Sequence, residues 1–322
     1  MDITAHPYSI ELATPFVISR GAKTHCHTVR VTINYKCFTG VGECTPYPRY
    51  HESVDSVVAQ IETCRQTLSE FTPYEAKQQL QSYPAGAARN AIDCALWSLI
   101  SQLENKKFPS PYFPIKDVIE TAMTVSIGSP DVMANQAKQY VAKGAGLLKI
   151  KLDGECVVER VAAVRSAAPH CRLILDANEA WGELNLATLF DQLVPYGIAM
   201  IEQPLAANED YRLADLAHPI PLCADESCHT RLDLEQLVGR YEMINIKLDK
   251  SGGLTEALLL EQKARQLGFR IMIGCMLGTS LAMKAALPIA SRAEIVDLDG
   301  PVLLGQDVEG GLKYAGGALH LE

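Results

Sequence analysis

Residues 122–152, AMTVSIGSPDVMANQAKQYVAKGAGLLKIKL, contain two short apolar runs joined by a segment whose apolar residues have helical spacing. The runs AMTVSI (122–127) and LLKIKL (147–152) have the length of buried strands, and a glycine-rich turn leads into the second one. A strand, a helix and a second strand in this order are typical of a βαβ unit with parallel strands.

Six further apolar runs follow, and all eight recur at intervals of about 22 to 27 residues. The six are RLILDA (172–177), IAMIEQ (198–203), IPLCAD (220–225), MINIKL (243–248), RIMIGC (270–275) and EIVDLD (294–299). Eight such runs favour a closed α/β barrel. Only about twenty residues remain after the eighth run, many of them glycine. We therefore expect a modified TIM barrel of the (β/α)7β type, without a regular last helix.

The N-terminal third follows a different pattern. Alternating strand-like segments and amphipathic helical segments are SIELATPF (9–16), TVRVTINYKCFTGVGEC (28–44), ESVDSVVAQIETCRQTLSEF (52–71) and AGAARNAIDCALWSLISQL (85–103). A linker rich in proline and lysine, KKFPSPYFPIKD (106–117), follows them. We predict an α+β capping domain in 1–110, the barrel in 111–304, and a C-terminal segment, 305–322, that returns to the capping domain.

Composition narrows the classes of partner. The net charge is −9 and no basic run is present, so we expect neither nucleic acid nor a membrane surface as a partner. The first 20 residues lack the apolar core of a signal peptide, and no stretch is apolar enough to span a bilayer. Ten cysteines without a CxxC pair predict a reduced, cytoplasmic protein, and we interpret His25-Cys26-His27 as an incidental part of a strand or loop. A small molecule is the expected partner, and the sequence does not predict the oligomeric state.

Charged residues stand at the ends of the apolar runs. In chain order they are Lys149, Lys151, Asp176, Glu202, Asp225, Lys247, Asp297 and Asp299. Active sites of such barrels lie at the C-terminal ends of the strands, so we expect these side chains at one barrel mouth. Each carboxylate alone is more typical of a helix cap or an ion pair. Three successive ones repel each other unless a cation lies among them, and three carboxylates suit Mg²⁺ or Mn²⁺ better than zinc.

The strand LLKIKL places Lys149 and Lys151 on one face and its apolar residues on the other. In isolation this pattern is typical of a surface strand. At the barrel mouth, a second ammonium and a metal ion would lower the pKa of a lysine toward the range that a general base needs. Lys247 arrives from the other side of the carboxylates. Two such bases predict proton abstraction next to a carboxylate, with inversion at that carbon.

These residues and their surroundings resemble the muconate lactonizing branch of the enolase superfamily, and within it the dipeptide epimerases of the L-Ala-D/L-Glu type. The motifs are KxK, DANEAW (176–181), EQP (202–204), ADES (224–227), NIKLDKSGG (245–253), GVGECTPYPRY (40–50) and PAGAARNAIDCALW (84–97). The resemblance implies that Asp176, Glu202 and Asp225 bind Mg²⁺. It also implies that Lys151 and Lys247 are the acid–base catalysts and that Lys149 supports Lys151.

The resemblance further implies a substrate. Asp297 and Asp299 would hold the free ammonium of a dipeptide, and two carboxylates at alternate positions of one strand need a cation in any case. The implied reaction interconverts L-Ala-D-Glu and L-Ala-L-Glu through an enediolate, in the reuse of cell-wall peptides. Gly278 departs from the branch, since many members carry an acid there. Arg20 and Lys23 are either contacts for the glutamate side chain or solvated loop charges.

Two other functions remain open. A lyase or cycloisomerase of the same branch, such as an o-succinylbenzoate synthase, would use one lysine as the base and the other to steady the enediolate. Its substrate has no ammonium, so the pair Asp297 and Asp299 favours the epimerase. A non-catalytic barrel would be expected to have lost a base or a metal ligand, and none is missing from this sequence.

Overall fold

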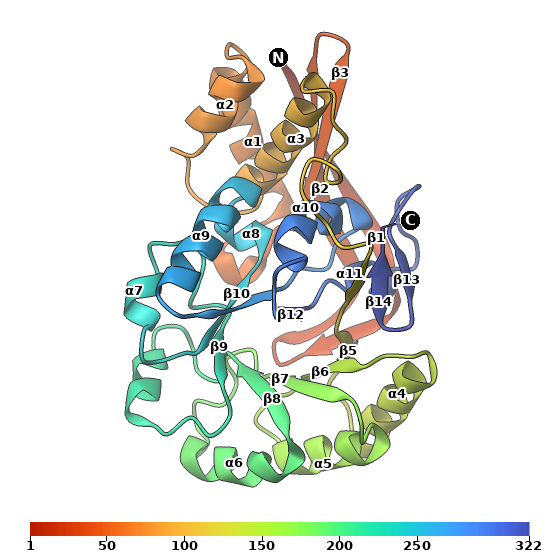
Figure 1. The fold of residues 1–322 in the computed structure, drawn as a ribbon, viewed down its shortest axis with the longest axis vertical. Helices are drawn as coiled ribbons and strands as arrows, with labels where there is room; N and C mark the ends of the chain where they lie inside the picture. The colour runs from red at the N-terminus through yellow and green to blue at the C-terminus, as the bar shows by residue number, and fades with distance from the viewer. Residues whose placement is uncertain (322) are drawn as a thin grey trace.

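The computed structural model describes residues 1–321 and has two parts, an N-terminal α+β domain and a barrel (Figure 1). Three antiparallel strands in the order β1-β2-β3 form the N-terminal sheet, and three helices pack beside it. The elements are β1 (Asp2–Ile18), β2 (Gly21–Tyr35), β3 (Phe38–Cys44), η1 (Pro48–Tyr50), α1 (Val54–Leu68), α2 (Pro73–Leu80) and α3 (Ala87–Leu103). Reciprocal capping boxes at Ser53 and Thr72 begin α1 and α2.

Two glycines let β3 lie directly on helix α3. A Cβ atom on Gly40 would lie 2.1 Å from the Ala95 carbonyl oxygen, and one on Gly42 would lie 2.2 Å from that of Ala91. Any larger residue would therefore push the helix off the sheet. This close packing fixes the direction in which β3 ends, and the loop that follows, Thr45–Tyr50, extends toward the barrel.

Eight parallel strands form the barrel sheet, in the chain order β5 to β12. They are β5 (Met123–Val125), β6 (Leu147–Lys151), β7 (Arg172–Asp176), β8 (Ile198–Glu202), β9 (Leu222–Ala224), β10 (Met243–Ile246), β11 (Arg270–Ile273) and β12 (Ile295–Val296). The Ala122 amide donates a hydrogen bond to the Val296 carbonyl oxygen at 2.8 Å, which joins the first strand to the last. The expected fold class, a modified barrel with an α+β capping domain, is confirmed.

Helices connect the barrel strands, but they are not uniform. They are α4 (Pro130–Ala142), α5 (Val157–Ala167), α6 (Leu186–Leu193), η2 (Val194–Tyr196), η3 (Asp210–Asp215), α7 (Leu234–Leu237), α8 (Leu248–Ser251), α9 (Leu254–Gln266), α10 (Ser280–Ala290) and α11 (Gly300–Leu303). Only short turns of helix connect β8 to β9 and β9 to β10. No helix within residues 1–321 combines the length and the apolar character needed to cross a membrane.

The interior of the barrel begins with one apolar layer. Each strand contributes one residue, which lies within the strand or directly before it. Each of these residues is at most 1% exposed. They are Ala122, Leu147, Ile174, Met200, Cys223, Met243, Met272 and Ile295. Such a layer closes the lower half of the barrel, so solvent and ligands have access only at the upper, C-terminal end of the strands.

The C-terminal segment makes two kinds of contact. The Gly305 amide donates to the Glu11 carbonyl oxygen of β1 at 2.8 Å, so the chain meets the N-terminal domain there. The chain then forms the hairpin β13 (Lys313–Ala315) and β14 (Ala318–His320), and β14 pairs with β4 (Val118–Glu120), directly before the barrel. Figure 1 shows this hairpin beside the barrel and the domain.

Buried polar contacts hold the N-terminal domain over the barrel mouth. Asp249 in α8 accepts hydrogen bonds from the Thr45 amide at 3.0 Å and from the Asn90 side chain at 2.8 Å. The Glu43 carboxylate accepts from the Thr279 amide and hydroxyl, both at 2.8 Å. These contacts fix the start of the Thr45–Tyr50 loop above the ends of the barrel strands.

Candidate active site

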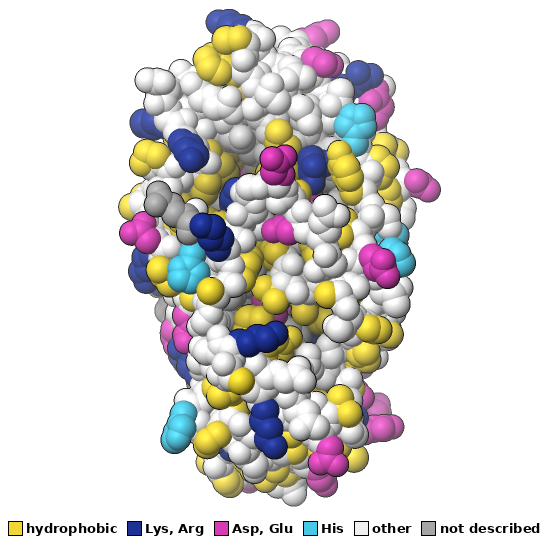
Figure 2. Space-filling model, turned by 90° about the vertical axis from the view of Figure 1, so that its right-hand side faces the viewer, with side chains coloured by type: hydrophobic (Ala, Val, Ile, Leu, Met, Phe, Trp, Pro, Cys, Tyr) yellow, Lys and Arg dark blue, Asp and Glu magenta, His cyan; other side chains and the backbone are white. Residues whose placement is uncertain are grey.

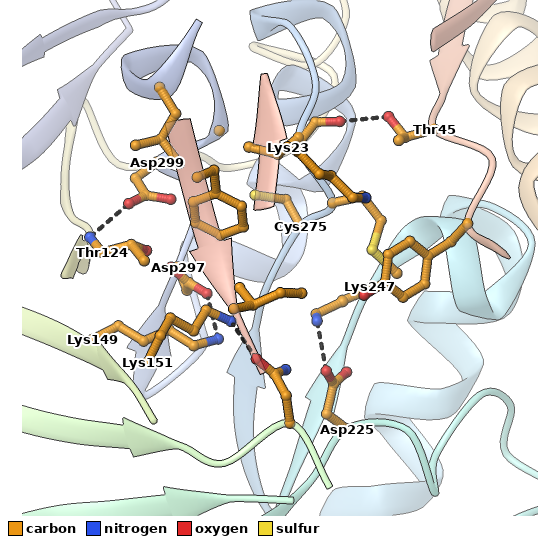
Figure 3. A pocket seen from close by; sticks show the side chains of 18 of the residues that line it. Lys23, Thr45, Thr124, Lys149, Lys151, Asp225, Lys247, Cys275, Asp297 and Asp299 are labelled. Atoms are coloured by element: carbon orange, nitrogen blue, oxygen red, sulfur yellow. Dashed lines mark hydrogen bonds and ion pairs between the residues drawn. The ribbon is translucent and has the colours of Figure 1, made fainter. Parts of the chain in front are cut away.

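A pocket lies at the upper end of the barrel, under the N-terminal domain. Both parts line it: residues of β1, β2 and the Thr45–Tyr50 loop from above, and the ends of the barrel strands from below. The lining includes Phe16, Ile18, Arg20, Lys23, Thr45, Tyr47, Tyr50, Thr124, Lys149, Lys151, Asn178, Asp225, Lys247, Cys275, Met276, Leu277, Asp297, Asp299, Gly300 and Leu303. Six of the eight charged residues that the sequence places at the strand ends line this pocket, whereas Asp176 and Glu202 are not part of the lining (Figure 3).

The three expected metal ligands lie on adjacent strands. Asp176 ends β7 and Glu202 ends β8, where the two residues are register partners. Asp225 follows the last residue of the next strand, β9. All three are at most 1% exposed. Three buried carboxylates in a row are costly unless positive charge compensates them.

Lysine ammonium groups supply that charge. Lys149 Nζ lies 3.0 Å from Asp176 Oδ2 and 2.7 Å from Glu202 Oε2. Lys151 Nζ lies 2.6 Å from Asp176 Oδ2, and Lys247 Nζ lies 2.6 Å from Asp225 Oδ2. Figure 3 shows Lys149 and Lys151 on one side of the pocket and Lys247 on the other. Lys151 and Lys247 therefore lie on opposite sides of the pocket, and their roles as bases stay predictions.

The ion pairs determine the charge states in this structure. Burial alone would lower the pKa of Lys149, but Asp176, Asp297 and Glu202 outweigh it and hold the pKa well above its usual value. Lys247 behaves alike, because Asp225 and Glu202 raise its pKa despite burial. The expectation of a lowered pKa concerned the pair Lys149 and Lys151 beside a metal ion, and it stays a prediction.

The carboxylates differ among themselves. Burial opposes ionisation of Asp176, but Lys149 and Lys151 outweigh it, so its pKa lies below the usual value. Lysines depress the pKa of Asp225 in the same way. Burial, with Asp176 and Asp225 nearby, instead raises the pKa of Glu202 to about 7. Glu202 is thus the carboxylate whose charge is least compensated.

The residues present fit a divalent cation. Among the described residues, 1–321, no three His, Cys, Asp or Glu side chains already form a group that could hold a metal ion. Lys149 Nζ lies between Asp176 and Glu202. Three buried carboxylates on adjacent strands are the oxygen donor set that a hard cation requires.

The expected ammonium site lies directly after β12. Asp297 Oδ2 lies 2.8 Å from Lys149 Nζ, whereas its Oδ1 is buried without a hydrogen-bond partner. Asp299 Oδ2 accepts from the Thr124 amide at 2.8 Å, and burial next to Asp297 raises the pKa of Asp299 to about 7. Both carboxylates line the pocket, and the structure pairs only Asp297 with a lysine.

Arg20 and Lys23, the two cations of the β1–β2 hairpin, have different surroundings. Arg20 donates to Glu226 at 2.8 Å, to the Tyr47 hydroxyl at 3.0 Å and to the Asn178 carbonyl oxygen at 3.1 Å, so barrel and loop groups occupy it. Lys23 lies over the Tyr47 ring, 4.8 Å from its centroid, and burial lowers its pKa. Both cations line the pocket, which a purely solvated loop charge would not do.

Two further sequence features lie outside the pocket lining. A Cβ atom on Gly278 would lie 3.5 Å from Thr45 Oγ1 and 3.6 Å from Glu43 Oε1, so an acid there would face another carboxylate of the domain interface. In the segment His25-Cys26-His27 of β2, both histidines are exposed, while Cys26 is buried and donates to the Leu277 carbonyl oxygen at 3.2 Å.

Several polar residues of the site were missed by the sequence analysis. They are Asn178, Glu226, Asn245 and Lys250. Asn245 carried a signal, because it is a polar residue inside the apolar run MINIKL. Glu226 follows Asp225 in the motif ADES, where the analysis assigned only the aspartate. Asn178 stands in a turn, where polar residues are common, and Lys250 stands in the short helix α8.

Comparison with known proteins agrees with this architecture. The profile of the Mandelate racemase / muconate lactonizing enzyme N-terminal domain matches residues 2–107, and that of the Enolase C-terminal domain-like family matches residues 132–322. The chain is 49% identical over 311 residues to the L-Ala-D/L-Glu epimerase of Escherichia coli (strain K12), which covers 96% of both chains. It is 43% identical over 289 residues to the N-acetyl-D-glutamate racemase of a Pseudoalteromonas species, which covers 90% of this chain and 91% of that one.

A solved structure extends the likeness to the fold. The dipeptide epimerase from Enterococcus faecalis V583, complexed with Mg and the dipeptide L-Leu-L-Tyr, superimposes with a TM-score of 0.92 at 30% identity, covering 99% of this chain and 96% of that one. Both halves of the chain, the strand-end residues and these relatives lead to one conclusion. The chain belongs to the mandelate racemase and muconate lactonizing enzyme family of the enolase superfamily.

Proposed function

We propose that this protein is a Mg²⁺-dependent isomerase that inverts the α-carbon next to the C-terminal carboxylate of a dipeptide, with L-Ala-D-Glu and L-Ala-L-Glu as substrates. The observation that carries the proposal is the placement of Lys151 and Lys247 on opposite sides of buried carboxylates. The 49% identical epimerase and the Mg-dipeptide complex of a structural relative support it.

Asp176, Glu202 and Asp225 hold the metal ion in this proposal. Mg²⁺, or Mn²⁺ in its place, supplies positive charge beside the substrate carboxylate, where negative charge grows as the α-proton leaves. The burial of all three carboxylates and the raised pKa of Glu202 support this assignment, since that pKa indicates a deficit of positive charge. Exclusion of water by the N-terminal domain would strengthen these electrostatic contributions.

Lys151 and Lys247 form the acid–base pair. One removes the α-proton, and the other returns a proton to the opposite face of the planar carbon, which inverts the configuration. Each lysine has its own carboxylate partner, Asp176 for Lys151 and Asp225 for Lys247. Lys149 supports Lys151 through Asp176, which both ammonium groups contact.

Asp297 and Asp299 bind the N-terminal ammonium of the dipeptide. Their carboxylates line the pocket, and Asp297 Oδ1 has no other partner. Lys23, across the pocket, is the cation available for the side-chain carboxylate of the glutamate, and Arg20 would exchange its contact with Glu226 to bind it. Opposite charges at the two ends of the ligand would fix both its direction and its length.

Incubation of L-Ala-L-Glu with the protein and Mg²⁺ in D2O, followed by NMR, tests the proposal. The parent should replace the glutamate α-proton by deuterium and form the other epimer. Lys151→Ala should still exchange the proton of one epimer through Lys247, and Lys247→Ala that of the other, while neither variant epimerises. Lys263→Met, on the exposed surface of α9, is the matched control. Exchange lost with both epimers in one variant, and with neither in the other, would indicate a one-base lyase instead.

One relative raises a second candidate, racemisation of an N-acylated glutamate. The 43% identical protein is an N-acetyl-D-glutamate racemase, and N-acetyl-glutamate keeps the amide of the dipeptide's peptide bond but has a methyl group in place of the ammonium-bearing first residue. The carboxylates of Asp297 and Asp299 favour the dipeptide, because a neutral methyl group would leave them without a counter-charge. N-acetyl-glutamate in the same D2O experiment separates the two candidates.

The cellular setting belongs to the same proposal. All ten cysteines of the chain are free, and seven of them are buried. Free thiols support a cytoplasmic location, because the cytosol keeps them reduced. Dipeptides that contain D-glutamate would reach the enzyme there from the reuse of cell-wall peptides.

A further inference from the structure

The two oxygens of each candidate metal ligand have different kinds of partner. One oxygen faces a lysine of the pocket: Asp176 Oδ2, Glu202 Oε2 and Asp225 Oδ2. The other oxygen accepts a hydrogen bond from a group other than these lysines: Asp176 Oδ1 from the Asn178 amide at 2.9 Å, Glu202 Oε1 from Asn245 Nδ2 at 2.7 Å, and Asp225 Oδ1 from Lys250 Nζ at 2.7 Å. We call these the front and rear oxygens. The rear partners hold each carboxylate in one orientation.

Lys250 is the only charged group among the three rear partners. It is 1% exposed and does not line the pocket. Its ammonium donates to the Asp225 carbonyl oxygen at 2.5 Å, to Asp225 Oδ1 at 2.7 Å and to the Asn245 carbonyl oxygen at 3.0 Å. One nitrogen thus donates to both the main chain and the side chain of Asp225, and it links the end of β9 to β10. All three protons of the ammonium have an acceptor.

This geometry restricts the rotation of Asp225. The Asp225 carbonyl oxygen, just past the end of β9, accepts from the Cys228 amide at 3.1 Å as well as from Lys250. From the same nitrogen, Lys250 also holds Oδ1. With Oδ1 held behind, Oδ2 is the oxygen left to face the pocket, where Lys247 contacts it.

We infer that Lys250 is a positioning residue of the metal site, which acts through Asp225 by keeping Oδ2 turned toward the cation. The inference rests on the proposed function, because it needs the metal site. It assigns to Lys250 no contact with substrate or metal.

If Lys250 only balanced charge, its removal would be expected to change the Mg²⁺ affinity in the opposite direction. A positive charge on the far side of a metal ligand repels the cation, so its removal should tighten Mg²⁺ binding if only charge matters. Loss of orientation should weaken binding, because a freely rotating carboxylate is a poorer ligand. The direction of the change in affinity therefore separates the two roles.

The test measures the Mg²⁺ dissociation constant by calorimetry and the melting temperature in EDTA. Lys250→Met removes the ammonium but keeps a side chain of similar length, and we expect the dissociation constant to rise about 10- to 100-fold. Lys250→Arg keeps the charge, yet its planar guanidinium cannot place three donors where one ammonium stands, so weaker binding is expected there too. Lys263→Met, a surface change on α9, should leave the constant unchanged.

A merely structural lysine would lower the melting temperature in EDTA and leave the Mg²⁺ constant of the folded variant as in the parent. That result, or tighter binding by Lys250→Met, would overturn the inference. A parent that binds no Mg²⁺ would instead refute the proposed function. If neither variant folds, a crystal structure of the parent with Mg²⁺ decides: the ion on Asp225 Oδ2 with Lys250 still on Oδ1 supports the role, and the ion on Oδ1 refutes it.

Discussion

The barrel interior has two layers that differ by two positions along every strand. The lower layer holds eight apolar side chains, one for each strand. The residues two positions further on are Thr124, Lys149, Asp176, Glu202, Asp225, Asn245, Gly274 and Asp297. Seven of these eight are polar, and those seven are at most 5% exposed. The same period of two places both layers inside the barrel, but only the lower one consists of residues usually found there.

This difference separates stability from function. The lower layer gains free energy by removing apolar surface from water. The upper layer loses hydration and recovers only part of it through ion pairs, so by itself it favours folding little. Between the layers the environment changes from a packed core to a pocket of low dielectric, where charges act strongly on one another and on a ligand. On the face of the molecule that Figure 2 shows, acidic and basic side chains are interspersed, unlike the concentrated charges inside.

The largest effect is expected when the cation of the upper layer is removed. EDTA should abolish epimerisation and added Mg²⁺ should restore it. Asp225→Asn should lower kcat/KM by roughly a thousandfold or more, since the metal supplies several kcal/mol of transition-state stabilisation. Initial rates with chelator and with a Mg²⁺ titration measure both effects. Full activity in excess EDTA would show that the upper layer works without a metal.

A smaller effect of a different kind is expected from the lower layer. Leu147 lies on the same strand and the same face as Lys149, and it is fully buried. Leu147→Ala should reduce the free energy of unfolding by about 2–5 kcal/mol, because it removes packed methyl groups and leaves a cavity. The kcat/KM of the folded variant should stay close to the parent value. Urea unfolding measures the first quantity, and a large loss of activity in the folded variant would contradict the separation of the two layers.

Much of the upper layer was predictable from the sequence. The period of the apolar runs predicted eight strands, and the charged residues at the ends of six of these runs predicted which side chains lie near the mouth. The pair Lys149 and Lys151 became informative only in context. A surface strand has the same alternation, and the neighbouring apolar runs with their carboxylates made a barrel strand the better prediction. The family and the fold class are confirmed, while the roles of individual residues stay predictions.

The rear of the site was not predictable, for physical reasons. Lys250 follows a strand in a short helical turn, where a lysine is ordinarily exposed, and nothing local shows that its ammonium is buried against Asp225. Arg20 pairs with Glu226, which is 206 residues away, so only the folded chain brings them together. Sequence periodicity tells which face a side chain occupies. It cannot tell which of the two oxygens of a carboxylate is held and which is free.

The smallest of these effects is the substrate preference that Asp297 and Asp299 impose. A dipeptide with a free ammonium can compensate the two carboxylates, of which Asp297 Oδ1 has no partner of its own. An N-acetylated dipeptide lacks that charge and should lose a few kcal/mol, or roughly a hundredfold in kcat/KM. Asp297→Gly should erase most of this preference, because the negative charge that disfavours the neutral group is gone.

The measurement compares kcat/KM for L-Ala-L-Glu and its N-acetyl form with parent and variant, together with the precursor of o-succinylbenzoate. Asp297 also contacts Lys149 at 2.8 Å, so the variant is expected to lose some activity with every substrate. The preference, a ratio measured within one protein, is insensitive to that common loss. Equal kcat/KM values for the free and the acetylated dipeptide with the parent would mean that the upper layer does not recognise the ammonium group. The lyase or the N-acylated substrate would then be the better explanation of this part of the pocket.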